Sequence, residues 1–191
     1  MKDTAAQSNK IQGLADFVSA QAVNKPLPVD TWHPPYCGDI GIAIKADGTW
    51  LYQGSPIQRK PLIKLFSRIL RRDPNGRHYL VTPAEKVDVD VADAPFLAVE
   101  MQVVGHGSHQ QLIFRTNVDD IVYCGPDNPL RFDEEQERGG LKPYVSVRGR
   151  LDALVSRSLC YDLVDLARPQ KSGENTLAIW SGGAFFPLPP A

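Results

Sequence analysis

Two amphipathic helical patterns at a constant spacing constrain the fold of this chain more than any other feature. Apolar residues recur at helical intervals in one segment and again 97 residues later (62 to 159), and an apolar strand residue after each helix keeps that spacing. The matched pairs are Leu62 and Leu159, Phe66 and Leu163, Ile69 and Leu166, and Leu80 and Leu177. Any two amphipathic helices match at some offset, but the shared offset of the strand favours an internal repeat. We therefore predict two similar halves in one chain.

The first half is predicted to contain a hairpin followed by a helix. Asp47-Gly48 lies between two alternating apolar runs, which is a strong hairpin signal. The helix is expected from Pro61 to Leu70, and residues 73–76 (Asp-Pro-Asn-Gly) are expected to end it. Strands are predicted at residues 79–82 and 87–91.

The second half is predicted to be mainly strands. A near-continuous apolar run covers residues 96–104, and shorter strands are expected at 110–116, 121–124, 144–147 and 151–155. Residues 133–140 are charged and end in glycine, which favours a loop. Ser156 or Ser158 can cap the second helix, and a last hairpin is expected over residues 176–188.

These patterns define an α+β fold whose halves are each mainly an antiparallel β-sheet or roll with one amphipathic helix. A helix behind Ser8 and Asn9 and a stiff proline-containing connection occupy residues 1–27. The N-terminal α+β half covers residues 28–95 and the C-terminal half residues 96–191. The 191 residues are 42% hydrophobic and 23% charged, which is enough apolar material for a folded core.

The charge balance limits the possible partners. Lys and Arg number 21 against 22 Asp and Glu, so the chain as a whole does not attract a polyanion and long nucleic acid is not expected as a partner. The three cysteines are far apart in sequence and form no zinc or disulfide pattern. No apolar run approaches the length of a membrane span and no secretory signal is recognisable, so we expect a cytoplasmic protein.

A basic stripe on the first helix is one candidate site. It is formed by Lys60, Lys64, Arg68 and Arg71, with Arg59 and Arg72 beside it, whereas the second helix carries Asp162 and Asp165. Such a stripe can bind phosphate or an acidic partner, or it can be an ordinary solvated helix face.

Residues 82–86 form a second candidate. Thr82, Glu85 and Lys86 bring a hydroxyl, a carboxylate and an amine to one strand end, where they can bind a ligand or form an exposed turn. Trp32 and Trp180 stand beside proline- or glycine-rich loops and can supply a stacking surface, although most aromatics in such a chain belong to the core.

Other chemistry-bearing residues carry weaker signals. His106 and His109 lack a third metal ligand at recognisable spacing, and the aspartates of residues 88–93 and 119–120 lack the order of a calcium loop. Phosphate-binding glycine loops, zinc-protease motifs and nucleophile elbows are absent from the sequence. We therefore expect no metal and no cofactor.

Several long strings resemble the bacterial family called domain of unknown function 1285. They are residues 32–40 (WHPPYCGDI), 54–57 (GSPI) leading into 59–62 (RKPL), 79–87 (YLVTPAEKV), 93–96 (DAPF) and 180–188 (WSGGAFFPL), so that the resemblance covers about residues 28–188. It implies a duplicated core, a C-terminal half loosely like a pleckstrin-homology fold, a ligand site between the halves suited to a nucleotide-like molecule, and a role in signalling. It implies no reaction.

Three functions stay open at this point. The first is a binding module that holds a small anionic ligand between the halves through Trp32, Asp39, Arg59, Lys60, Lys64, Thr82, Glu85, Lys86 and Trp180. The second is an enzyme that uses Glu85, His33 or Asp39 as acid or base. The third is a protein-interaction adaptor with an exposed apolar patch.

Overall fold

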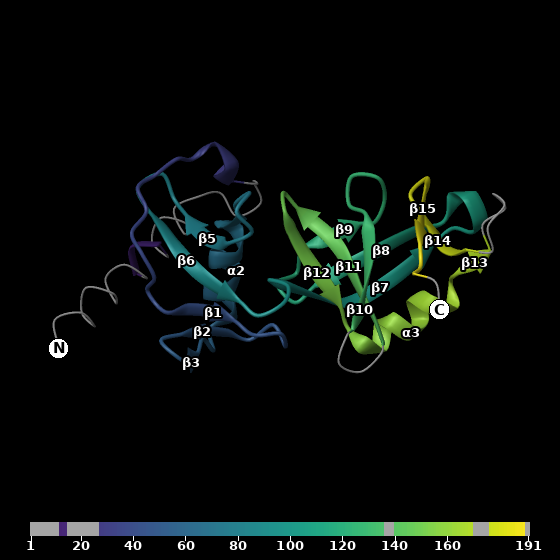
Figure 1. Ribbon diagram of the computed structural model, residues 1–191, viewed down its shortest axis with the longest axis horizontal. Coiled ribbons are helices and arrows are strands. Elements are labelled where there is room, and N and C mark those ends of the chain that lie inside the picture. The colour runs from purple at the N-terminus through teal and green to yellow at the C-terminus, as the bar shows by residue number, and fades with distance from the viewer. Residues whose placement is uncertain (1–11, 15–26, 136–139, 170–175, 190–191) are drawn as a thin grey trace. The chain divides into compact units, whose positions relative to one another are not determined.

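The computed structural model describes residues 12–14, 27–135, 140–169 and 176–189. The chain divides into two compact units, residues 1–93 and 94–191, and each contains one six-stranded sheet (Figure 1). The fold is α+β with two similar halves, as the sequence predicts.

The N-terminal unit builds its sheet from two antiparallel meanders. Its elements are η1 (Val29–Thr31), β1 (Ile42–Ile44), β2 (Trp50–Tyr52), β3 (Ser55–Pro56), α2 (Lys60–Arg68), β4 (Leu70–Arg72), β5 (His78–Val81) and β6 (Lys86–Val91). The strand order is β3-β2-β1-β6-β5-β4, and β1 runs parallel to β6. The hairpin at Asp47-Gly48 is confirmed: the Asp47 carboxylate accepts a 2.9 Å hydrogen bond from the Thr49 amide, and Gly48 has a φ of +77°.

The C-terminal unit repeats this strand path. Its elements are β7 (Phe96–Val104), η2 (Gly107–His109), β8 (Gln111–Thr116), β9 (Ile121–Tyr123), β10 (Leu130–Glu135), β11 (Gly140–Arg148), β12 (Leu151–Val155), α3 (Arg157–Asp165), β13 (Arg168–Pro169), β14 (Leu177–Ser181) and β15 (Ala184–Pro187). The order β10-β11-β12-β7-β8-β9 again joins two antiparallel meanders through one parallel pair, β12 with β7. In both sheets the chain runs from the centre to one edge and then from the other edge back to the centre.

The two helices occupy different places along this path. α2 connects the two meanders of its sheet, whereas α3 follows both meanders and leads into the small antiparallel sheet β13-β14-β15. The similarity of the sheets therefore relates β1–β6 to β7–β12, and it does not use the 97-residue spacing that relates α2 to α3. A duplication at that spacing stays a prediction.

The first helix ends earlier than its apolar periodicity predicts. Ile69 caps α2 with a φ of −104°, and Leu70 begins β4, where it pairs with Leu80 of β5. The prediction that Leu70 and Arg71 belong to the helix is therefore wrong, and residues 73–76 turn the chain between β4 and β5. Helical spacing could not reveal this, because the competing hydrogen bonds come from a strand about ten residues away.

The charged segment 133–140 is also more ordered than predicted. Residues 130–135 form β10, which pairs along its length with β11. The prediction of a loop is wrong for residues 133–135 and 140, and residues 136–139 lie outside the described part. Edge strands of natural sheets are often charged, so charge alone did not separate edge strand from loop here.

Most of the N-terminal helix predicted behind Ser8 and Asn9 lies outside the described residues. Within it, residues 12–14 are helical and Leu14 is fully buried. None of the helices in the described part of the chain is long and apolar enough to cross a bilayer.

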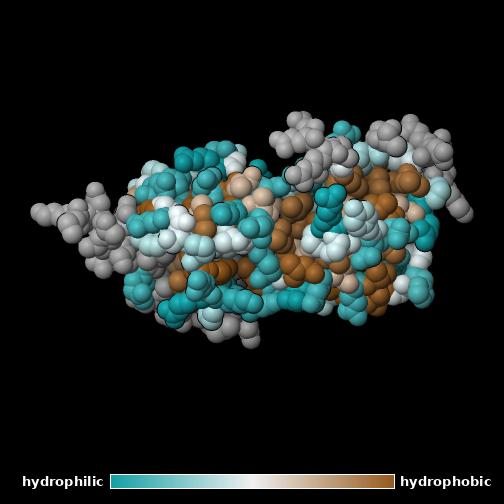
Figure 2. Space-filling model, turned by 90° about the horizontal axis from the view of Figure 1, so that it is seen from below, coloured by the Kyte–Doolittle hydropathy of each residue, from teal (hydrophilic) through white to brown (hydrophobic). Residues whose placement is uncertain are grey.

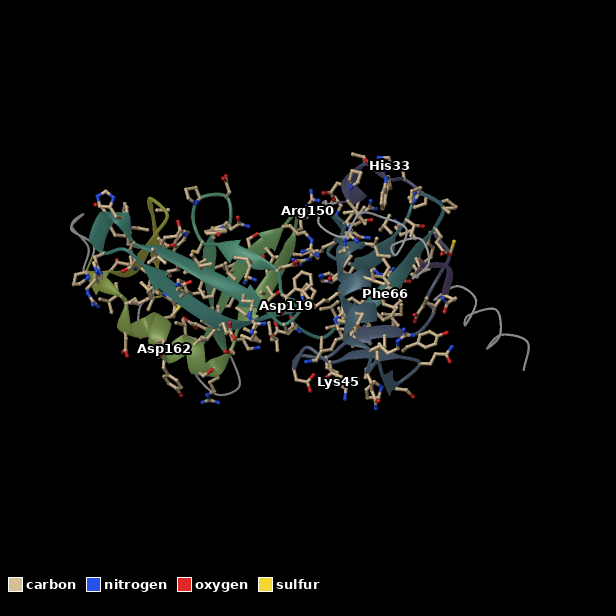
Figure 3. All side chains as sticks on the ribbon, turned by 180° about the vertical axis from the view of Figure 1, so that it is seen from behind. His33, Lys45, Phe66, Asp119, Arg150 and Asp162 are labelled. Carbon is tan, nitrogen blue, oxygen red and sulfur yellow. The ribbon has the colours of Figure 1, made fainter. Side chains whose placement is uncertain are left out.

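The core of the N-terminal unit lies on one face of its sheet. Trp50 is fully buried and its ring centroid lies 6.4 Å from that of Phe66 on α2, which Figure 3 shows inside the unit. Trp50 pairs with Ile44, and Ile44 pairs with Val91 of β6. Because side chains alternate along a strand, α2 covers the face of Val87, Val89 and Val91, and the alternate residues of β6 face away from it.

Candidate functional site

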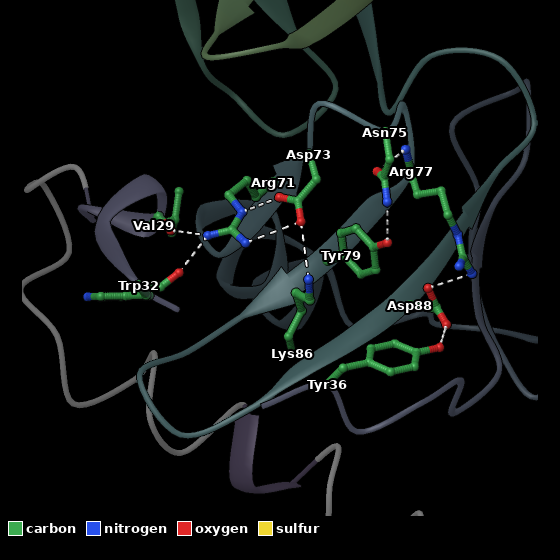
Figure 4. A network of polar contacts seen from close by, with 10 residues as sticks. All are labelled: Val29, Trp32, Tyr36, Arg71, Asp73, Asn75, Arg77, Tyr79, Lys86 and Asp88. Atoms are coloured by element: carbon green, nitrogen blue, oxygen red, sulfur yellow. Dashed lines mark hydrogen bonds and ion pairs between the residues drawn. The ribbon is translucent and has the colours of Figure 1, made fainter. Parts of the chain in front are cut away.

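The face of β4–β6 opposite α2 carries a set of charged and aromatic side chains. Arg71 pairs with Tyr79 in one ladder and Tyr79 pairs with Asp88 in the next, so the three lie side by side across the sheet. Lys86 lies two residues before Asp88, and Asp73 follows the end of β4. We call Arg71, Asp73, Tyr79, Lys86 and Asp88 the polar face (Figure 4).

Two cations of the polar face share one carboxylate. Asp73 accepts a 2.6 Å bond from Nε of Arg71 and a 3.2 Å bond from Nζ of Lys86, and all three side chains are at most 22% exposed. Burial raises the pKa of Asp73, but the hydrogen bonds from Arg71 and Lys86 outweigh burial and hold that pKa below its ordinary value. The Arg71–Asp73–Lys86 group therefore keeps one positive charge that this carboxylate does not balance.

The remaining hydrogen-bonding capacity of Arg71 is directed to the backbone of residues 27–39, which we call the strap. Nη1 of Arg71 donates to the carbonyls of Val29 (2.7 Å) and Trp32 (2.8 Å). The Arg71 side chain is only 10% exposed, and Figure 4 shows both bonds leaving the sheet toward the strap.

A second ion pair occupies the neighbouring part of the face. Nη2 of Arg77 lies 2.8 Å from Asp88, and the Tyr36 hydroxyl donates to the other oxygen of the same carboxylate. This hydrogen bond holds the pKa of Tyr36 above its ordinary value. The Tyr36 phenol is thus stabilised in its protonated form.

Tyr79 connects the two groups. Its ring lies 4.4 Å from Nζ of Lys86, a cation–π distance, and meets the ring of Tyr36 edge-on at 6.4 Å. Its hydroxyl accepts a 3.0 Å bond from the Asn75 amide. The Tyr79 ring therefore lies between Lys86 and the Tyr36–Asp88 pair.

Several residues predicted from the sequence lie at or beside the polar face. Lys86 is part of it, and Trp32 takes part through its carbonyl. Thr82 is 3% exposed, and its hydroxyl accepts bonds from the amides of Ala84 and Glu85 at 3.3 and 3.2 Å, so Thr82 organises the turn into β6. Glu85 belongs to that turn.

The other predicted residues lie elsewhere. Arg59, Lys60 and Lys64 are exposed on or next to α2, on the opposite side of the sheet from Lys86. Asp39 is exposed and accepts a 2.7 Å bond from the Gly41 amide, which is a local turn. Arg68 belongs to α2, but Arg71, which was predicted on the same stripe, lies on β4.

Trp180 belongs to the C-terminal unit. Its ring packs edge-on against Phe185 at 4.4 Å, and its carbonyl accepts a 2.7 Å bond from Gln110. The buried indole N–H has no hydrogen-bond partner in the described structure. Next to it, the buried Ser181 hydroxyl donates to the Cys124 carbonyl (2.7 Å) and accepts from the Leu112 amide (2.9 Å), which ties the last hairpin to β8.

A corresponding arrangement exists in the C-terminal sheet. The sequence Leu-Arg-x-Asp occurs at residues 70–73 and again at 130–133. Arg131 pairs with Tyr144 as Arg71 pairs with Tyr79, forms an ion pair with Asp133, and lies over the Tyr144 ring at 4.2 Å. This short repeat is the sequence signal that could have drawn attention to Arg71 and Asp73.

The two arrangements differ on the third strand. Tyr79 pairs with Asp88 of β6, and Tyr144 pairs with Leu154 of β12. Two residues before these partners stand Lys86 in one sheet and Asp152 in the other. Asp152 lies 3.2 Å from Arg131, so the C-terminal group contains one cation and two carboxylates, whereas the Arg71–Asp73–Lys86 group contains two cations and one carboxylate.

Comparison with known proteins identifies the family to which the chain belongs. Residues 27–94 match the N-terminal domain model of a domain of unknown function, DUF1285, and residues 95–188 match the model of its C-terminal domain. The chain belongs to the DUF1285 family.

Two solved structures of that family are similar to this chain. A DUF1285 protein from Silicibacter pomeroyi DSS-3 is 44% identical with a TM-score of 0.83, over 92% of this chain and 93% of that one. A DUF1285 protein from Shewanella baltica OS155 is 25% identical with a TM-score of 0.53, over 65% of this chain and 91% of that one. A search of the curated proteins gives no match.

Proposed function

We propose that the chain is a binding module for a small anionic ligand and that the polar face of the N-terminal unit is its binding site. The observation behind this proposal is that Arg71 and Lys86 share the single carboxylate of Asp73 in a largely buried position. An unbalanced cation in such surroundings attracts an anion more strongly than an exposed one, because water screens it less.

The C-terminal unit supports the proposal by analogy. There the Arg131–Asp133 pair accepts a further carboxylate, that of Asp152. The Arg-x-Asp and tyrosine arrangement is therefore compatible with an additional anion beside the arginine. At the corresponding position the N-terminal unit has Lys86 in place of an acid. Its group therefore has a net positive charge, which an anion from outside the chain can balance.

The neighbouring groups favour a ligand that is more than a bare ion. The Arg77 side chain is 61% exposed and Tyr36 is 55% exposed, so a guanidinium that is paired with Asp88 and an aromatic ring border the polar face. A phosphate or carboxylate attached to a planar group fits these features, and a nucleotide is one such molecule. The signalling role implied by the family resemblance belongs to the same proposal, which uses groups from the N-terminal unit alone.

Calorimetry and thermal shift with inorganic phosphate and adenosine monophosphate test the proposal. K86Q is expected to weaken binding about tenfold, which is about 1.4 kcal/mol. K60Q is the matched control, because Lys60 is an exposed lysine on α2 on the other side of the sheet. If K60Q and K64Q weaken binding and K86Q does not, the site is the helix stripe. If neither probe binds the wild-type chain, the proposal is wrong.

A protein-interaction role is a second candidate, and it concerns the C-terminal unit. Nine of the ten exposed large hydrophobic side chains in the described part of the chain belong to this unit, including Tyr123 at 62% and Ile121 at 53% exposure. Figure 2 likewise shows hydrophobic residues gathered mainly over the C-terminal unit on the face it draws. An I121S/Y123S variant that leaves all association in cell extract unchanged would count against this role.

The enzyme alternative receives less support from the geometry. Asp39 is engaged in a local turn, and Glu85 lies in the turn organised by Thr82. His33 is exposed on the strap, at the periphery of the unit in Figure 3. Tyr36, a strap residue that donates to Asp88 of the polar face, has a raised pKa, which disfavours its action as a base.

A further inference from the structure

The strap occupies the part of Arg71 that an anion would use. Of the groups that Arg71 contacts, Asp73 is charged, but the carbonyls of Val29 and Trp32 are neutral. A guanidinium attracts an anion more strongly than a neutral carbonyl, because the anion adds a charge–charge attraction to the hydrogen bond. An anion at this place would therefore compete directly with the two carbonyls.

Arg131 shows what the same arrangement does without a strap. Its side chain is 48% exposed, compared with 10% for Arg71, and its second partner is the Asp152 carboxylate instead of backbone carbonyls. The strap carbonyls thus take, in the N-terminal unit, the role that an anion takes in the C-terminal unit.

The strap is attached to the sheet in two separate ways. Arg71 donates hydrogen bonds to its first part, η1 and Trp32, and all three residues of η1 are at least partly exposed. Its second part continues the sheet: the Cys37 amide donates to the Lys86 carbonyl at 2.8 Å, and the Lys86 amide donates to the Pro35 carbonyl at 3.1 Å. Pro34 and Pro35 stand where the second part begins, and they keep the chain extended there.

We propose that the first part of the strap, residues 27–32, is a displaceable cover of the anion site. An anion that binds Arg71 and Lys86 replaces the carbonyls of Val29 and Trp32 and releases η1, while residues 35–38 stay paired with β6. This inference rests on the proposed function, since it assigns to that site its regulation.

Hydrogen exchange in the presence of inorganic phosphate tests the inference in the unmodified chain. Once η1 is released, its single turn is too short to persist, so the Thr31 and Trp32 amides, bonded now to Pro28 and Val29, are expected to exchange about tenfold faster. The Cys37 amide is the internal control and is expected to keep its rate. Sodium chloride at matched ionic strength controls for screening.

Calorimetry on the same samples separates the two ideas. Phosphate binding together with faster exchange at Thr31 and Trp32 supports the cover. Binding with unchanged or slower exchange there overturns the cover and leaves the binding site standing. Absence of binding to both phosphate and adenosine monophosphate overturns both. If only adenosine monophosphate binds, unchanged exchange at Thr31 and Trp32 with that ligand overturns the cover.

A pair of variants gives a readout that needs no ligand. R71Q removes the two hydrogen bonds that Arg71 donates to the carbonyls of Val29 and Trp32, and it is expected to speed exchange at Thr31 and Trp32 without phosphate. R131Q removes the corresponding arginine of the C-terminal unit and is expected to leave these amides unchanged. Equal exchange at Thr31 and Trp32 in folded R71Q and wild-type protein would show that Arg71 does not hold the strap.

Discussion

The two six-stranded sheets follow the same strand path, but one corresponding position carries a positive side chain in one sheet and a negative side chain in the other. Each places an arginine of the edge strand beside a tyrosine of the next strand and an aspartate two residues further on. The third strand then adds Lys86 in one sheet and Asp152 in the other. The shared topology therefore specifies where these side chains meet, and a single position decides whether the group has a net positive or a net negative charge.

The largest expected effect concerns the two aspartates. D73N leaves Arg71 and Lys86 half-buried without their carboxylate and is expected to lower the free energy of unfolding by about 3 kcal/mol. D133N removes a carboxylate that is 48% exposed and is expected to cost at most about 1 kcal/mol. Urea unfolding of both variants measures the difference. Equal losses of unfolding free energy in D73N and D133N would contradict the difference in burial between the two aspartates.

A smaller loss of stability is expected in the C-terminal unit, where the neutral hydroxyl of Ser181 anchors the last hairpin. S181A removes the hydroxyl that joins β14 to Leu112 and Cys124 and leaves buried polar groups without a partner, at a cost of about 2 kcal/mol. S158A, at an exposed serine of α3, is the control, with an expected change below about 0.5 kcal/mol. A loss in S158A as large as that in S181A would contradict this account of the hairpin.

A charge exchange sharpens the comparison further. K86D gives the N-terminal group the charge of the C-terminal one and is expected to abolish the thermal shift caused by phosphate. D152K makes the reverse change in the C-terminal group. The K86D/D152K double variant is expected to bind phosphate about tenfold more tightly than K86D alone. A double variant that responds no more than K86D would show that the charge of this position does not decide anion binding.

The smallest effect is a dependence of stability on pH. The pKa of Asp73 is lower in the folded chain than the ordinary value of about 3.9, so its contribution is complete above that value and is lost as the pH falls through the folded-state pKa. Wild-type protein should therefore lose more stability than D73N between neutral pH and about pH 3. Urea midpoints across this range measure the difference, and parallel curves would exclude a role for Asp73.

Sequence patterns predicted the fold better than the site. Alternation and turn residues located the Asp47-Gly48 hairpin and the strand at residues 96–104, because both signals are local. They misplaced Arg71, because helical periodicity continued past Arg68 into residues that pair with β5. Extending the predicted helix by less than one turn therefore assigned Arg71, the most buried cation of the polar face, to the helix instead of to β4.

The candidate residues divide in the same way. Lys86 was predicted from a local cluster of functional groups, and the structure places it in a larger one. Tyr36, Asp73, Tyr79 and Asp88 were not predicted as site residues, because each stands alone in the sequence and meets the others only across strands or through the strap. The repeated Leu-Arg-x-Asp string was visible, but its meaning depends on the tyrosine opposite.

The sequence by itself determined that the chain forms two similar α+β halves, since apolar periodicity and turn chemistry act over a few residues. Only the tertiary structure decided which charges face one another: the strand register places Arg71 beside Tyr79 and brings Lys86 to Asp73, and the strap brings two backbone carbonyls to Arg71. Register and strap contacts join residues up to about fifty positions apart, and no local pattern encodes which of them will meet.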